Sequence, residues 1–200
     1  MSKWTRRLGL ALEWTCHGIP WIACVLSWLI LLWINNTQGV KVHSSYNILW
    51  DKQFLKLSSD EIDTNVPRLL SLLIALLFDA ITVGLIKLTF RRQRPKGDNH
   101  SDMRLTVGVD AWSFPSGHAS RSTMLFFLIS YLWLSSSSIK LWIGCLLLLW
   151  SIIVCYSRYA MRRHHITDIL AGCILGYGEY YLIKQINWNL VALYLSSYLF

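Results

Sequence analysis

The sequence predicts an all-α protein, a polytopic transmembrane bundle of about five helices, and three observations support this prediction. The 200 residues are 54% hydrophobic and 15% charged, whereas soluble domains usually carry about 25% charged residues. Tryptophan, which concentrates at membrane interfaces, occurs 11 times. Apolar runs close to the roughly 20 residues that cross a bilayer recur along the chain, and its length suits one domain.

Five apolar runs are the predicted spans, and the shorter ones can cross because their polar flanks reach the headgroups. They define a membrane domain over residues 19–186. A polar segment at 35–66 is predicted as a loop that carries a surface helix. Residues 187–200 are too few to cross and are predicted as an interfacial tail. The spans are Ile19–Ile34, Leu69–Phe90, Ala119–Leu134, Ile139–Tyr156 and Ile169–Ile186.

The N-terminal segment, residues 1–18, is predicted to lie at the interface. Its basic start resembles that of a signal peptide, but Glu13 and His17 interrupt the apolar stretch and no small-residue cleavage site follows cleanly. Trp4 and Leu12 belong to a set of apolar residues whose spacing predicts a short amphipathic helix among the headgroups.

The net charge of +8 is compatible with an anionic membrane surface, an anionic substrate or nucleic acid. Nucleic acid is the partner least favoured, because the basic residues lie beside apolar runs instead of on a soluble face. The five cysteines form no CxxC pair, so they are predicted to be small buried residues and not metal ligands or disulfides. The bilayer and an anionic lipid are therefore the expected partners.

Basic residues close the second predicted span. Lys87 and Arg94 are seven residues apart, which is two helical turns, so both side chains can point the same way. Pro95 cannot continue the helix and ends it. Taken alone, these residues are more simply explained as a positive membrane anchor, a role that Arg91 and Arg92 fit better.

The sequence Pro115-Ser116-Gly117-His118 directly precedes the third span. Serine is a preferred N-cap, and glycine lets the backbone approach a ligand closely. The free N–H groups at such a helix start attract an anion, and His118 on the first turn could donate a proton. A capped helix with an incidental histidine explains the pattern equally well.

A third cluster joins the fourth and fifth spans, and it contains Arg158, His164 and Asp168. His164 and Asp168 are spaced i, i+4 and share a face if helical, so the carboxylate could orient the imidazole. Arg158 offers a planar fork that suits phosphate. The simpler alternative is a solvated turn with a local ion pair.

The three clusters fall at one membrane face if the five helices alternate in direction. One pocket would then hold two histidines, an orienting carboxylate and three cations. Phosphoryl transfer needs these groups: charge stabilisation, an activated nucleophile and an acid for the leaving oxygen.

The chain resembles the type 2 phosphatidic acid phosphatase superfamily, because three motifs match in order and internal spacing. These are Lys87-x6-Arg94-Pro95, Pro115-Ser116-Gly117-His118 and Ser157-Arg158-x5-His164-x3-Asp168. Further stretches resemble the polyisoprenoid (presqualene) diphosphate phosphatases within it: 17–21, 109–121 and 163–168.

This resemblance implies a phosphohistidine mechanism that uses no metal ion and no cofactor. His164 would attack phosphorus, Asp168 would orient it, and His118 would protonate the leaving oxygen and then activate water. The residues implied to hold the phosphate are Lys87, Arg94, Ser116, Gly117 and Arg158. Asp79, a carboxylate within the second span, is predicted instead as a buried polar contact between helices.

The implied substrates are the isoprenoid diphosphates, namely farnesyl, geranylgeranyl and presqualene diphosphate. Phosphatidic, lysophosphatidic and sphingoid-base phosphates are the alternatives. A catalytically silent membrane scaffold is a different class of function, and the presence of every proposed catalytic side chain argues against it. The resemblance also implies a multi-pass protein of the endoplasmic reticulum and nuclear envelope.

Sidedness follows from the distribution of lysine and arginine. The predicted catalytic face carries more of these residues than the opposite face, even with the site residues left out, so the positive-inside rule places it in the cytoplasm. Many members of the superfamily face the lumen instead. We expect the sequon Asn99-His100-Ser101 on this face to stay unglycosylated in eukaryotic cells. An endoglycosidase-sensitive glycan that disappears in Asn99→Gln would place the active site in the lumen.

Overall fold

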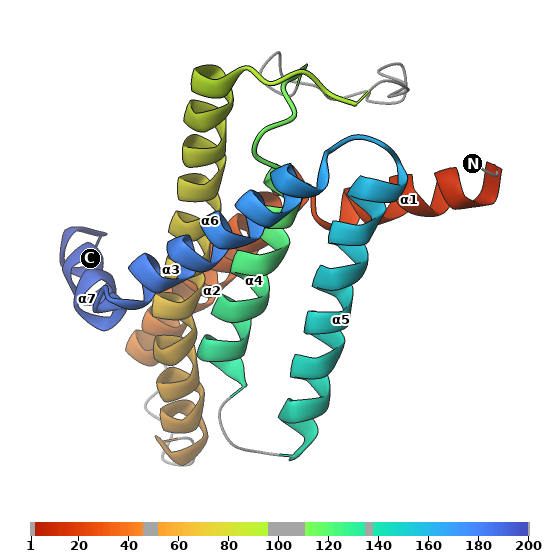
Figure 1. Cartoon of the computed structure of the whole chain (residues 1–200). Helices are drawn as coiled ribbons and strands as arrows, with labels where there is room; N and C mark the ends of the chain where they lie inside the picture. Colours follow the sequence, from red (N-terminus) through yellow and green to blue (C-terminus); the bar gives the residue numbers. More distant parts are fainter. Residues whose placement is uncertain (1–2, 46–51, 96–110, 135–137, 200) are drawn as a thin grey trace.

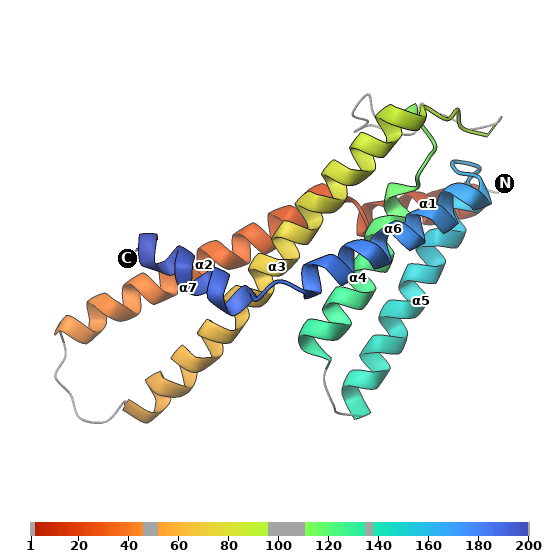
Figure 2. The same cartoon turned by 60° about the vertical axis from the view of Figure 1, so that its left-hand side comes forward.

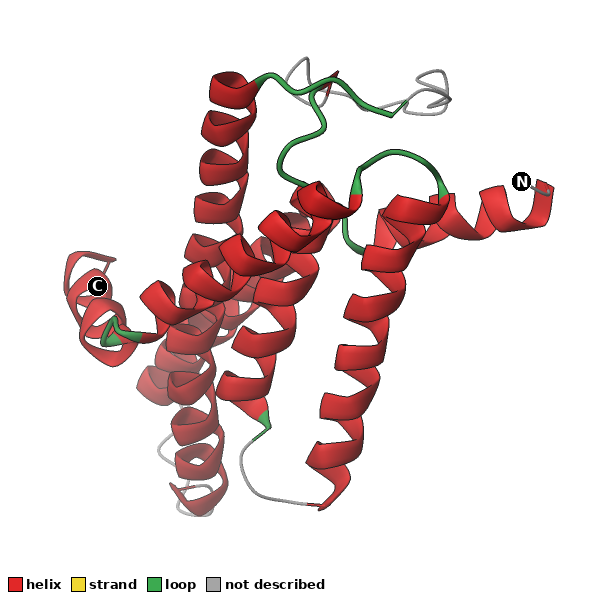
Figure 3. Cartoon of the chain, viewed as in Figure 1, coloured by secondary structure: helices red, strands yellow, loops and turns green. Residues whose placement is uncertain are grey.

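The structure, a computed structural model, describes residues 3–45, 52–95, 111–134 and 138–199. These residues form seven helices and no strand (Figure 3), which confirms the predicted all-α fold. Asn99 lies outside the described residues. The helices are α1 (Lys3–Thr15), α2 (Gly18–Ser45), α3 (Lys52–Phe90), α4 (Gly117–Trp133), α5 (Ser138–Ala160), α6 (Ile166–Lys184) and α7 (Trp188–Leu199).

Within the described residues, three helical stretches are long and apolar enough to cross a membrane: Arg7–Ile34, Asn65–Phe90 and Leu141–Ala160. Many of their large apolar side chains point outward; Trp142, for example, is 73% exposed. Lipid is as apolar as such side chains, so outward apolar faces suit a membrane protein. The other two predicted spans correspond to α4 and α6, with 17 and 19 residues, which pack more extensively on each other than any other described pair.

The segment 35–66 differs from the predicted loop. Helix α2 continues to Ser45 and α3 already begins at Lys52, so the described part of this segment is helical. Extending an existing helix adds one hydrogen bond for each residue fixed, whereas starting one is costly. The two apolar spans therefore act as nuclei from which helix extends into polar sequence.

The five cysteines are free thiols, as predicted, but they are not uniformly buried. Cys16 is buried, whereas Cys24 and Cys145 are exposed on α2 and α5. An apolar side chain on the outer face of a membrane helix meets lipid instead of water, so it has no need of cover from protein.

Helices α4 and α6 approach each other through glycines. A Cβ atom on Gly172 would lie 2.5 Å from the carbonyl oxygen of Ser116, and one on Gly176 would overlap the carbonyl oxygen of Ser120. Small residues at such positions allow two membrane helices to pack backbone against backbone. The N-terminal ends of α4 and α6 are thereby held together.

The ends of four helices lie together at one end of the bundle. The C-terminal ends of α3 and α5 lie there with the N-terminal ends of α4 and α6 (Figures 1 and 2). Helix α1 lies at the same end and packs against α5, as Figure 1 shows. The expected convergence of the three polar clusters is therefore present in the fold.

Charged side chains are buried between the helices below this end. Arg121 of α4 forms a 2.6 Å ion pair with Asp79 of α3, whose side chain is fully buried. Glu179 of α6 accepts hydrogen bonds from Thr82 and Ser120. The predicted role of Asp79 as a contact between helices is confirmed by this geometry, and Arg121 also donates to the Cys16 carbonyl oxygen.

Candidate active site

His164 lies in the short loop between α5 and α6 and is buried, with 4% of its surface exposed. Its Nδ1 atom is 2.7 Å from the carbonyl oxygen of Ser113. A carbonyl oxygen can only accept, so Nδ1 carries the proton and donates it. The Nε2 atom is left with its lone pair, as a nucleophilic imidazole requires.

Burial, reinforced by the positive charges of Arg94 and Lys87, holds the pKa of His164 well below its usual value of 6.5. The hydrogen bond to Ser113 opposes this shift less strongly, and Arg158 adds to it. The imidazole is consequently neutral at physiological pH. Lys87 and Arg94 at the end of α3 and Arg158 on α5 thus act on His164 from two separate segments.

Asp168 makes no hydrogen bond to the His164 side chain, contrary to the expectation that it orients the imidazole. Its Oδ1 pairs with Arg92 at 2.7 Å, and its Oδ2 accepts a 2.8 Å hydrogen bond from the His165 backbone N–H. The i, i+4 argument required both residues to be helical, but α6 begins at Ile166. Asp168 therefore caps its own helix and holds Arg92, while the Ser113 carbonyl orients His164.

The start of α4 is built as its sequence predicted. Ser116 is the N-cap, and its Oγ accepts a 3.4 Å hydrogen bond from the Ala119 N–H. The Ser116 N–H donates to the carbonyl oxygen of Asp168 at 3.0 Å, which ties α4 to α6. Gly117 is the first helical residue, and a Cβ there would lie 3.2 Å from the Val83 side chain.

His118, on the first turn of α4, presents a polar atom that is not satisfied. Its Nε2 is buried and has no hydrogen-bond partner among the described residues. Arg158, Arg121 and His164 all lie within electrostatic range of this imidazole. Buried polar atoms are nearly always hydrogen-bonded, so this nitrogen is suited to a partner that arrives with a ligand.

Arg158, predicted to hold phosphate, is almost fully buried and is tied to the N-terminal helix. Its Nη2 donates to the Gly9 carbonyl oxygen at 3.1 Å, and its Nη1 lies 3.4 Å from Glu13 Oε2. Glu13 Oε1 also pairs with Arg163 at 2.6 Å. Helix α1 therefore contributes a carboxylate to the site.

The two remaining predicted cations come from the α3 end. Lys87 is in the last turn of α3 and is 3% exposed. Arg94 follows in the irregular segment after Phe90 and is half-buried. Both side chains act electrostatically on His164, so the structure gathers all the predicted cations around one imidazole.

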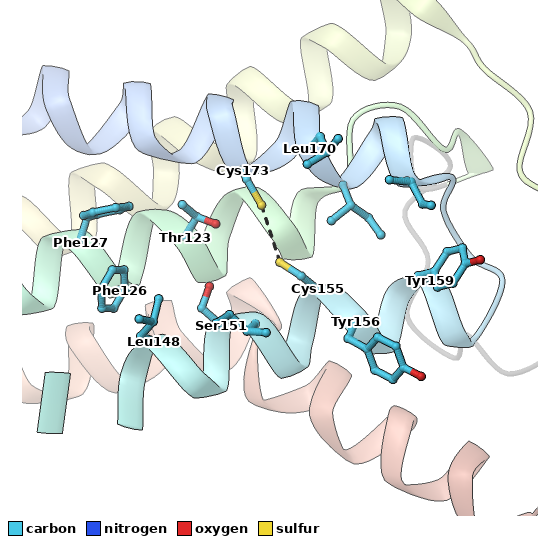
Figure 4. Close-up of a pocket in the computed structure, with 13 residues that line it drawn as sticks. Thr123, Phe126, Phe127, Leu148, Ser151, Cys155, Tyr156, Tyr159, Leu170 and Cys173 are labelled. Carbon is cyan, nitrogen blue, oxygen red and sulfur yellow. Dashed lines mark hydrogen bonds between the residues drawn. The ribbon is translucent and has the colours of Figure 1, made fainter. Parts of the chain in front are cut away.

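An apolar cavity of about 490 Å³ lies between α4, α5 and α6 (Figure 4). Tyr159 and Ile166 line it beside the loop that carries His164, and Leu148 lines it at the other end. Since Leu148 precedes Tyr159 by 11 residues on one helix, the cavity runs about 16 Å along α5. Cys155 and Cys173, whose sulfur atoms are 3.8 Å apart, lie between these ends.

Three contributors were not expected from the sequence: the Ser113 carbonyl, Arg92 and Glu13. A backbone carbonyl carries no side-chain signature, and Arg92 is one member of a basic run. Glu13 interrupts an apolar helix, and this is the one feature of the sequence that could have indicated its ion pairs with the two arginines. Across the residues that the structure describes, no three His, Cys, Asp or Glu side chains are grouped as a metal site.

Comparisons with known proteins find a similar sequence and a similar fold. The chain is 36% identical over 132 residues to a protein of Arabidopsis thaliana named probable lipid phosphate phosphatase beta, a match that covers 56% of this chain and 62% of that protein. The chain thus aligns with less than two thirds of that relative's length.

The fold is similar to a crystal structure titled as a transmembrane PAP2 type phosphatidylglycerolphosphate phosphatase from Bacillus subtilis. The TM-score is 0.56 at 17% sequence identity, and the similarity covers 92% of this chain and 77% of that one. The model of the PAP2 superfamily matches residues 68–192, which is more than half of the chain and includes all three motifs. The chain therefore belongs to the PAP2 superfamily.

Proposed function

We propose that the protein is a metal-independent membrane phosphatase that hydrolyses isoprenoid diphosphates through a phosphohistidine on His164. The observation that carries the proposal is a neutral, buried imidazole whose Nε2 lone pair is free. Cations from two segments, the end of α3 and α5, act on this imidazole, and an apolar cavity begins beside its loop. The cations can thus bind an anionic headgroup while the adjacent apolar cavity holds the hydrocarbon chain of the same lipid.

In the first step, Nε2 of His164 attacks the terminal phosphorus in line. The N–P bond forms as the bond from phosphorus to the leaving oxygen breaks. Lys87, Arg94 and Arg158 stabilise the charge on the equatorial oxygens, together with the Ser116 hydroxyl and the Gly117 N–H. The bound anion favours the protonated form of His118, which gives its proton to the leaving oxygen.

In the second step, His118 acts as a base. It takes a proton from water, whose oxygen attacks phosphorus as the N–P bond breaks. Inorganic phosphate leaves and His164 recovers its lone pair. The Ser113 carbonyl holds the attacking tautomer throughout, and Asp168 fixes the start of α6 next to it.

The apolar cavity supports a substrate with an extended hydrocarbon chain, which isoprenoid diphosphates possess. One similar protein is named for lipid phosphate and the other for phosphatidylglycerolphosphate, so phosphatidic, lysophosphatidic and sphingoid-base phosphates are the second candidates. A silent scaffold is the third, and the full set of site residues counts against it. A hydrolysis assay separates the three.

Activity of the detergent-solubilised protein is expected to survive EDTA and to be inhibited by vanadate, because this scheme uses protein cations and an oxyanion pocket. The assay compares farnesyl, geranylgeranyl and presqualene diphosphates with phosphatidic and lysophosphatidic acids, and measures released phosphate. A preference for phosphatidic acid would overturn the substrate proposed. Loss of activity in EDTA with recovery on magnesium would overturn the mechanism, and no hydrolysis at all would favour the scaffold.

A further inference from the structure

Glu13 of α1 is a partly buried carboxylate at the edge of the proposed phosphate site. Its two carboxylate oxygens are divided between two arginines, with Oε1 on Arg163 at 2.6 Å and Oε2 near Arg158 at 3.4 Å. Both arginine side chains are almost fully buried, whereas Glu13 is 15% exposed. One carboxylate therefore balances two desolvated guanidinium groups, and the site keeps an excess of positive charge.

Arg158 has few N–H groups left for a ligand. A guanidinium carries five donors. The Nε donor is used by Ser157 at 3.2 Å, and Nη2 donates to the Gly9 carbonyl oxygen. The Nη1 group faces Glu13. Its present partner is therefore an anion, which another anion can replace.

Helix α1 is fastened to the site at further points. A Cβ on Gly9 would overlap the sulfur of Met161, in the loop before His164, so the backbone of α1 lies directly on that loop. Cys16 at the end of α1 donates through its thiol to the His118 carbonyl oxygen at 3.4 Å. This packing holds Glu13 beside Arg158 and Arg163.

We propose that Glu13 is the counter-ion that a substrate phosphate displaces from Arg158, and that it remains paired with Arg163 during the exchange. This inference rests on the proposed function. Glu13 neutralises Arg158 in the free enzyme and keeps its guanidinium in place. The carboxylate of Glu13 and a bound phosphate are both negatively charged and repel each other. Glu13 therefore also weakens the binding of every oxyanion and so speeds the release of inorganic phosphate.

Replacing Glu13 by glutamine tests the exchange, because the amide keeps the shape of the side chain and removes its charge. We expect vanadate and inorganic phosphate to bind about tenfold more tightly to Glu13→Gln, measured by calorimetry on the full chain in detergent. The KM for the lipid substrate should fall with them. A purely structural role for Glu13 would loosen the site and weaken oxyanion binding instead.

Arg163→Gln is the second variant, and it should act in the opposite direction. Glu13 would then give its whole charge to Arg158, so vanadate should bind more weakly. Leu8→Ala is the matched control on α1, since Leu8 is 64% exposed, and it should leave oxyanion binding unchanged. Thermal unfolding in detergent checks that each variant is folded.

Unchanged or weakened vanadate binding in folded Glu13→Gln would overturn the exchange. If that variant does not fold, Arg163→Gln decides, and tighter or equal vanadate binding there would overturn it. These outcomes differ from failure of the proposed function, in which the wild-type protein itself neither binds vanadate nor releases phosphate from any lipid.

Discussion

Replacing His164 by alanine is expected to reduce turnover by about 10⁴-fold or more, because the covalent route through the phosphohistidine disappears. The protein should remain folded in membranes, since the imidazole makes one hydrogen bond, to the Ser113 carbonyl. The measurement is phosphate release from farnesyl diphosphate by purified protein, together with a search for acid-labile phosphoenzyme in rapidly quenched samples.

Two neighbouring histidines give the controls. His165→Ala keeps the backbone N–H that Asp168 accepts, so it should retain most of the activity. His118→Ala should still bind phosphate, and with an activated leaving group it should accumulate phosphoenzyme, because the base for the second step is missing. Hydrolysis at the wild-type rate by His164→Ala would exclude this nucleophile.

Replacing Arg121 by alanine is expected to destabilise the fold by about 3–5 kcal/mol, the usual cost of leaving a buried charge without its partner. Asp79 is fully buried and pairs with this guanidinium at 2.6 Å. Glu179 is also close enough to interact with Asp79, so the variant would leave two buried carboxyl groups together without the guanidinium of Arg121. Thermal unfolding in a mild detergent measures the loss.

The double variant Asp79→Leu with Arg121→Leu provides the comparison. Apolar residues in place of both partners leave no unpaired charge, so most of the stability should return. Equal unfolding temperatures for Arg121→Ala and the wild-type protein would mean that the pair contributes nothing. A double variant less stable than Arg121→Ala would contradict the desolvation argument.

The positions of the helices and the meeting of the three motifs at one end of the bundle were predictable, because both depend on local sequence patterns. Apolar runs predicted helices α2 to α6, and alternation of their directions predicted that Lys87, His118 and His164 would meet. The extension of α2 and α3 into 35–66 was not predicted, because the end of a helix depends on small differences that a polar sequence does not mark.

The orienting partner of His164 was beyond sequence analysis for a different reason. The spacing to Asp168 was meaningful only within a helix, and His164 lies just before one. The true partner is a main-chain oxygen, which every residue possesses. The ion pair between Glu13 and Arg163 joins residues 150 positions apart, and no periodicity or local motif records such a contact.

The contact between α4 and α6 has a consequence for the environment in which the site must work. Bilayers differ in thickness, and spanning helices respond by tilting or sliding. Gly172 and Gly176 seat one main chain directly on the other, with no flexible side chains between them to absorb a shear. His118 is fixed to the start of α4 and His164 directly precedes α6, so we expect the two helices to tilt together and the two imidazoles to keep their separation in bilayers of different thickness.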